Sequence, residues 1–189
     1  MSDESIPIHY VCTRQEARRL VNDRREFWIS NCGCREGRGG CTRSRMDLCL
    51  MFDDIPATGS GKRTATMKDV EEVLRLAESS HLVPRPFRNE DRTATAGICF
   101  CCDDCCGYFL DPAEKCDTGA FIERTALESC TQCGVCVDVC HFGARTMAEG
   151  ELAIDRDKCY GCGLCADVCP ATCIEMIPRK SQSELVDGR

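Results

Sequence analysis

The sequence predicts an α+β fold whose C-terminal domain, at residues 119–178, holds short strands and helices around two metal centres. A small, mainly helical and cysteine-rich domain is expected at residues 1–118, and a polar tail at residues 179–189. Three observations predict this organisation: the 20 cysteines among 189 residues, a cysteine run that occurs twice, and two helix-capping signals in the N-terminal half.

The arrangement of the cysteines favours metal binding over disulfides. No apolar leader segment follows the first residues. Most cysteines are two to four residues apart, a spacing that suits ligands of one metal centre better than distant disulfide partners. Only 6% of the residues are aromatic, so metal–thiolate bonds are expected to supply part of the folding free energy. We therefore expect a reduced, cytoplasmic metal protein without a membrane span.

Charge is distributed unevenly along the chain. Residues 1–98 carry 16 Lys and Arg against 15 Asp and Glu, whereas residues 99–189 carry 8 against 16. We interpret these regions as a basic and an acidic docking surface for redox partner proteins, not for nucleic acid. The alternative is solvated charge that keeps the protein soluble. Nine arginines fall in the basic region: Arg14, Arg18, Arg19, Arg24, Arg25, Arg35, Arg38, Arg43 and Arg45.

The most specific motif is the repeated cysteine run. Residues 130–140 read CTQCGVCVDVC and residues 159–169 read CYGCGLCADVC, with seven identities in eleven positions. Each copy has the form C-x2-C-x2-C-x3-C, in which three thiolates bind one 4Fe–4S cluster and the fourth binds the other cluster. By this rule one cluster takes Cys130, Cys133, Cys136 and Cys169, and the other takes Cys159, Cys162, Cys165 and Cys140.

Segments that flank the runs agree with a small dicluster fold. Short strands are predicted at 121–127 and 151–154, with a turn at Glu149-Gly150. Gly134 and Gly163 suit tight loops whose N–H groups face cluster sulfurs. Residues 119–178 resemble a bacterial-type dicluster ferredoxin domain, which implies two 4Fe–4S clusters in a ferredoxin-like fold.

Two residues depart from the ferredoxin pattern. His141 stands where the family has proline, and it is either a hydrogen-bond donor near a cluster or a solvated side chain. We interpret Cys173, an extra cysteine, as a packed free thiol.

Two capping boxes predict helices in the N-terminal half. Residues 13–16 open a helix over 14–28, and residues 66–69 open a helix over 67–80. The segment 84–86, with a proline at each end, is predicted to be extended.

Nine further cysteines are candidate metal ligands. Adjacent cysteines point in different directions, so the run CFCCDDCCGYF at 99–109 is expected to face two sites. If that run is helical, Cys101 and Cys105 share one face, and Cys102 and Cys106 share the next. We expect one or two further iron–sulfur clusters, with ordinary 4Fe–4S clusters favoured over an unusual cluster or a structural zinc site. The nine are Cys32, Cys34, Cys41, Cys49, Cys99, Cys101, Cys102, Cys105 and Cys106, which leaves Cys12 and Cys116 isolated.

The N-terminal motifs extend the resemblance to residues 30–178. They are CGCREGRGGC followed by DLCLMF, the helix end LAESSHLV, Asn89, and ICFCCDDCCG. Together with the repeat they resemble a poorly characterised family of iron–sulfur proteins from strict anaerobes, which pair a cysteine-rich N-terminal region with a dicluster ferredoxin domain. The resemblance implies this architecture and no known reaction.

Three functions are compatible with these patterns. We favour a non-catalytic electron carrier that passes single electrons between redox partners along several clusters. The second is a small reductase that binds an anionic substrate at an N-terminal centre near Arg35, Arg38, Arg43 and Arg45. The third is a regulatory protein that responds to oxygen or metal supply.

Overall fold

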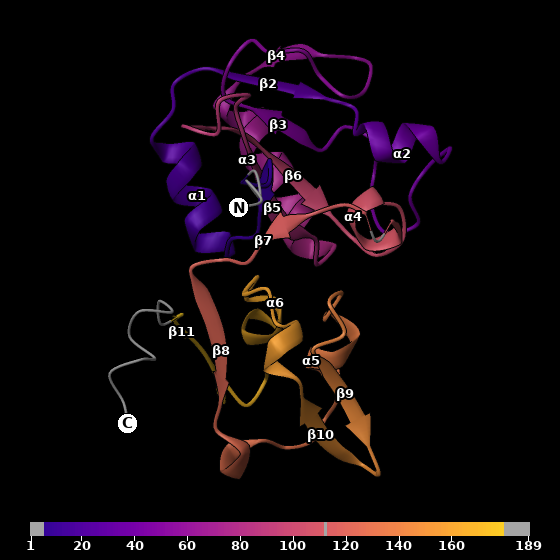
Figure 1. Ribbon diagram of the computed structural model, residues 1–189, viewed down its shortest axis with the longest axis vertical. Coiled ribbons are helices and arrows are strands. Elements are labelled where there is room, and N and C mark those ends of the chain that lie inside the picture. The colour runs from indigo at the N-terminus through magenta and orange to yellow at the C-terminus, as the bar shows by residue number, and fades with distance from the viewer. Residues whose placement is uncertain (1–5, 112, 180–189) are drawn as a thin grey trace, which may run out of the picture.

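A computed structural model describes residues 6–111 and 113–179, and in it the chain folds around one large sheet and two small ones (Figure 1). The large sheet has the strand order β4-β2-β3-β6-β5-β1-β7. Its neighbours are antiparallel except for β1 and β7, which run parallel. The strands are β1 His9–Tyr10, β2 Phe27–Ser30, β3 Cys49–Met51, β4 Arg63–Ala65, β5 Val83–Arg88, β6 Thr95–Cys101 and β7 Cys116–Asp117.

Two longer helices pack their apolar faces against the large sheet. Helix α1 spans Arg14–Asn22 and α3 spans Met67–Ser79, and both begin with the predicted capping boxes, at Thr13 and Thr66. The box satisfies backbone N–H groups that have no partner inside the helix. In one apolar core the helices contribute Ala17, Val21, Val70, Val73, Leu74 and Ala77.

The expectation of a mainly helical N-terminal region is wrong, because residues 9–117 are organised by the large sheet. The predicted helix over 14–28 ends at Asn22, and the apolar residues after it form β2. There Trp28 pairs with Met51 and Thr64. Aromatic and β-branched residues fit a strand better than a helix. Strand β3 is only three residues long and wholly buried, so it shows no alternating pattern.

The C-terminal half consists of two small antiparallel sheets and two short helices. The predicted strands at 121–127 and 151–154 are present as β8 and β10, and Glu149-Gly150 forms the turn between β9 and β10. The strands are β8 Phe121–Thr125, β9 Arg145–Ala148, β10 Glu151–Ile154 and β11 Ile174–Pro178, paired β8 with β11 and β9 with β10. The short helices of the chain are α2 Gly33–Gly37, α4 Gly107–Leu110, α5 Val135–Asp138 and α6 Leu164–Asp167, with 3-10 turns at Leu127–Ser129 and Arg156–Lys158.

Figure 1 shows the large sheet in the upper part of the molecule and the two small sheets below it. Strand β7 ends the large sheet at Asp117, and β8 begins four residues later in the lower part. No helix of the described residues is long and apolar enough to cross a membrane. From residue 180 onward, the predicted polar tail lies outside the described residues.

We expect Thr66→Ala to lower the thermal unfolding temperature, because alanine cannot accept the N–H of Asp69 at the start of α3. Loss of such a cap costs about 1 kcal/mol, which lowers Tm by about 2–4 °C in a chain of this size. Thr66→Ser keeps the hydroxyl and is the matched control. Anaerobic thermal unfolding followed by circular dichroism measures both, and equal Tm values for the two variants would contradict the expectation.

Candidate metal centres

Two cavities in the C-terminal half are lined by the repeated cysteine runs, and each cavity takes cysteines from both runs. The first cavity is lined by Cys130, Cys133, Cys136 and Cys169, together with Cys173. The second cavity is lined by Cys140, Cys159, Cys162 and Cys165. Two clusters that exchange their fourth ligand require this grouping.

Two glycines in the left-handed backbone conformation lie in the loops around these cavities. Gly134 and Gly163, with φ of 78° and 80°, precede α5 and α6 and start each helix directly after a cysteine loop. Burial raises the pKa of Cys162 and of Cys165 to about 12. These thiols are therefore neutral near pH 7 until a metal displaces their protons.

A buried arginine, Arg145, lines the second cavity and contacts a cysteine of the first. Arg145 donates from Nη1 to Cys136 Sγ at 3.4 Å and from Nη2 to Glu123 Oε2 at 2.5 Å. Burial alone would lower the pKa of Arg145, but Cys165 and Cys136 outweigh burial and raise it. Glu123 is also buried, and Arg156 Nε lies 3.0 Å from its Oε1. Neither Arg145 nor Glu123 was apparent from the sequence, because neither lies in a cysteine run.

Six cysteines of the N-terminal half, here called the six-thiol group, interact as successive neighbours. The thiol of Cys34 interacts with those of Cys32 and Cys106. The thiol of Cys101 interacts with those of Cys106 and Cys99. Cys99 and Cys101 lie on the same face of β6, because residues two apart in a strand share a face. Cys99 pairs across the sheet with Cys49 of β3, and their thiols interact. The group is Cys32, Cys34, Cys49, Cys99, Cys101 and Cys106.

Arg85 supplies buried positive charge to the six-thiol group. It lies on β5 opposite Cys99, is 3% exposed, and donates from Nη1 to Cys106 Sγ at 3.2 Å. Its guanidinium stacks 4.5 Å from the centre of the Tyr108 ring. Burial alone would lower the pKa of Arg85, but Cys101 and Cys106 outweigh burial and raise it. A charged residue between two prolines in a predicted extended segment was the only sequence signal.

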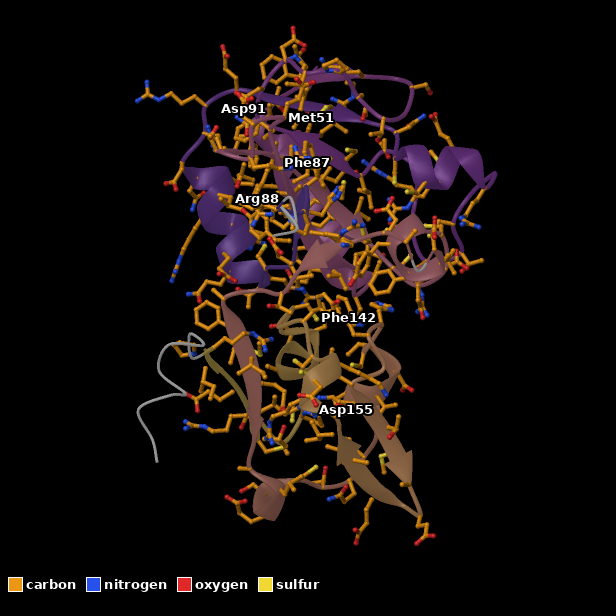
Figure 2. The ribbon with its side chains drawn as sticks, in the orientation of Figure 1. Met51, Phe87, Arg88, Asp91, Phe142 and Asp155 are labelled. Carbon is orange, nitrogen blue, oxygen red and sulfur yellow. The ribbon has the colours of Figure 1, made fainter. Side chains whose placement is uncertain are left out.

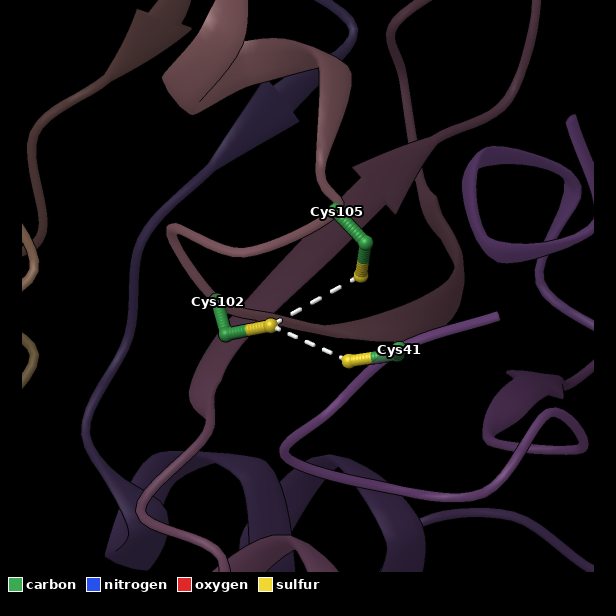
Figure 3. Close-up of side chains that lie close together, drawn as sticks. All are labelled: Cys41, Cys102 and Cys105. Carbon is green, nitrogen blue, oxygen red and sulfur yellow. Dashed lines mark hydrogen bonds between the residues drawn. The ribbon is translucent and has the colours of Figure 1, made fainter. Parts of the chain in front are cut away.

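The remaining three candidates form a second N-terminal set, here called the three-thiol group (Figure 3). Cys102 Sγ lies 3.6 Å from Cys41 Sγ and 3.6 Å from Cys105 Sγ. The run at 99–109 therefore faces two sites, but not through a helix. Strand β6 ends at Cys101, a turn follows, and α4 begins after Cys106. The helical pairing of Cys101 with Cys105 is wrong.

The three extra cysteines have different surroundings. Cys12 is 2% exposed in the apolar core. Cys116 was expected to be isolated but lies near Arg85 and Cys101, and burial raises its pKa to about 11. Cys173 is buried as expected, with its Sγ 3.5 Å from Cys169 Sγ in the first cavity.

Four aromatic side chains, here called the aromatic junction, pack where the upper and lower parts meet; Figure 2 labels Phe142 there. Phe142 and Tyr160 stack with ring centres 4.5 Å apart, and Tyr108 lies 5.9 Å from Tyr160. Phe109 lies 5.1 Å from Phe142. In the chain, Tyr108 follows Cys106 by two residues and Tyr160 follows Cys159 directly, so the junction connects the six-thiol group with the second cavity.

His141 also joins the two parts. Its side chain is 1% exposed, with Nδ1 3.1 Å from Asp103 Oδ1. Nε2 lies 2.9 Å from the carbonyl oxygen of His81. The interpretation of His141 as a solvated side chain is therefore wrong.

Residues 129–173 match the family described as the 4Fe-4S dicluster domain. The chain contains a ferredoxin-type iron–sulfur domain. The matched residues include all eight cysteines that line the two cavities as crossed sets. Such a domain supports a role in electron transfer, which implies redox partners. No curated protein matches the chain.

We expect Gly161→Ala to lower the iron content of the ferredoxin-type domain by about four atoms per chain. Gly161 has φ of 80°, and an added Cβ would collide with the carbonyl of Phe121 beside the second cavity. Gly150→Ala is the control, because Gly150 has φ of 88° but open space around it. Iron assay of anaerobically purified protein measures both variants, and equal iron contents would rule out this steric requirement.

Proposed function

We propose that this protein carries single electrons between redox partner proteins through more than two metal clusters. Two of these clusters are bound by the cysteines of the two cavities, in a domain at residues 119–178. Each cluster takes three cysteines from one run and the fourth from the other. A further iron–sulfur centre is bound by cysteines of the six-thiol group, in a cysteine-rich domain at residues 1–118. The aromatic junction carries this proposal, because it packs the end of the six-thiol group against the loop of the second cavity.

The chain's own residues set the conditions for electron transfer. Arg85 and Arg145 donate to sulfurs, and donors to sulfur together with burial tune the potential of an iron–sulfur cluster. The lower part also offers acidic side chains that suit a basic partner surface. Those exposed to solvent are Glu128, Asp138, Glu149, Glu151, Asp155, Asp157, Asp167 and Glu175, of which Asp167 pairs with Arg14 and Glu175 with Arg124.

The arginine-rich N-terminal region offers less docking surface than its charge predicts. Arg14 Nη1 lies 3.0 Å from Asp167 Oδ2, which ties α1 to α6. Arg18 pairs with Glu71 at 3.1 Å. These arginines hold the two parts and the two helices together, so the acidic surface is the better candidate for partner binding.

The reductase alternative is weaker because most of the arginines that it needs are also engaged within the chain. Arg35 is 1% exposed beneath the thiols. Arg43 Nε lies 2.8 Å from Asp103 and Arg45 Nε lies 2.6 Å from Asp47. These three arginines are engaged within the chain, and of the four only Arg38 is exposed without an ion pair among the described residues.

An iron and sulfide assay, followed by a redox titration, tests the proposal. We expect anaerobically purified protein to hold more than the roughly eight iron atoms that two 4Fe–4S clusters contain. The double variant Cys101→Ala, Cys106→Ala should lower iron to that level, and the titration should show one-electron centres by electron paramagnetic resonance. Cys12→Ala removes a buried thiol outside both groups and is the control. About eight iron atoms in the unmodified protein would exclude an N-terminal cluster.

We expect Arg85→Met to shift the reduction potential of the N-terminal centre to more negative values. Reduction adds negative charge, and Arg85 stabilises that charge by its own charge and by its donation to Cys106 Sγ. Arg85→Lys keeps the charge and should shift the potential less. Voltammetry on variants with unchanged iron content measures the shift, and a potential that is unchanged or more positive would contradict this role.

A further inference from the structure

The three-thiol group is the tightest set of three possible metal ligands among the described residues. Cys102 Sγ lies 3.6 Å from each of its two partners. All three sulfurs lie within 4.8 Å of one another, and no other three potential ligand side chains among the described residues come so close together. Figure 3 shows the three sulfurs pointing toward one another from a loop and the turn after β6.

This spacing matches ligands that share one metal ion. With zinc–sulfur bonds of about 2.3 Å and tetrahedral angles, two thiolates on one ion lie about 3.8 Å apart. A cubane gives each thiolate its own iron, which places the sulfurs farther apart. The short distances therefore favour a mononuclear site over a cluster.

The surroundings of the group also fit one divalent ion. Arg35 is 1% exposed, and its Nη2 donates to the carbonyl oxygen of Phe100 at 2.9 Å, which fixes the guanidinium. Its Nε has no hydrogen-bond partner, and its charge acts on Cys32 of the six-thiol group as well as on Cys105 and Cys41. Three thiolates and a divalent ion carry one net negative charge, which a single arginine balances.

A carboxylate lies beside one cysteine of the group, Cys41. Asp104 Oδ2 accepts the backbone N–H of Thr42 at 2.8 Å. The Asp104 side chain also lies within interaction range of the Cys41 thiol. A tetrahedral zinc site needs four ligands, of which the three sulfurs supply three. Asp104 lies beside Cys41, but its carboxylate is not within 4.8 Å of all three sulfurs.

We propose that Cys41, Cys102 and Cys105 bind one zinc ion at a site separate from the iron–sulfur centres. Soft thiolate ligands select zinc among the common divalent ions. Zinc is not redox-active, so the ion carries no electrons. It instead fastens the loop at Cys41 to the turn that leads into the aromatic junction. This site goes beyond the proposed electron carrier and does not depend on it.

Metal analysis of the full chain tests the zinc site. We expect about one zinc per chain in anaerobically purified protein with its full complement of iron and sulfide. Cys102→Ala and Cys105→Ala should each lose the zinc and retain the iron, whereas the control Cys12→Ala should retain both. Absence of zinc from the unmodified protein, or loss of iron and sulfide together from the Cys102 and Cys105 variants, would overturn the proposal.

X-ray absorption at the zinc edge keeps the test decisive if the variants fail to fold, because it reports on zinc alone in the presence of iron. The unmodified protein should show sulfur neighbours at about 2.3 Å from zinc. A zinc environment without sulfur neighbours would reject thiolate ligation. An N-terminal cluster is judged separately by iron above about eight atoms per chain, so failure of the zinc site and failure of the electron carrier are distinguishable.

Discussion

Three arginines are buried beside cysteine thiols in this small protein, and each places a positive charge next to sulfur. Arg35 is 1% exposed, and Arg85 and Arg145 are each 3% exposed. A buried guanidinium without a partner would cost many kcal/mol. Each arginine instead lies beside sulfur. Arg145 lines the second cavity and donates to Cys136 of the first, and Arg85 donates to Cys106 of the six-thiol group. Arg35 acts on thiols of both N-terminal groups.

The large sheet is the device that brings these charges and thiols together. Arg85 on β5, Cys99 on β6 and Cys49 on β3 are direct neighbours across three adjacent strands. The turn after β6 then separates adjacent cysteines, so that Cys101 and Cys102 serve different groups. Because α4 follows this turn directly, the aromatic junction and the N-terminal thiols occupy fixed positions relative to the ferredoxin-type domain.

The repeat made the C-terminal half predictable, because spacing within eleven residues encodes which cysteines share a cluster. The helix starts at Arg14 and Met67 were also predictable, since a capping box is local. The large sheet was not, because its strands are short, buried and paired between distant residues. For the same reason the sequence could not show that Cys101 groups with Cys106, or that Arg35 and Arg85 are buried beside thiols.

Anomalous diffraction from anaerobically grown crystals tests most directly whether the sulfur groups are separate metal centres. Data collected on both sides of the iron and zinc absorption edges locate each metal independently. We predict iron in both cavities of the ferredoxin-type domain and in the six-thiol group, and zinc alone between Cys41, Cys102 and Cys105. Iron confined to the two cavities, with no metal at the six-thiol group, would contradict a continuous path of centres through this protein.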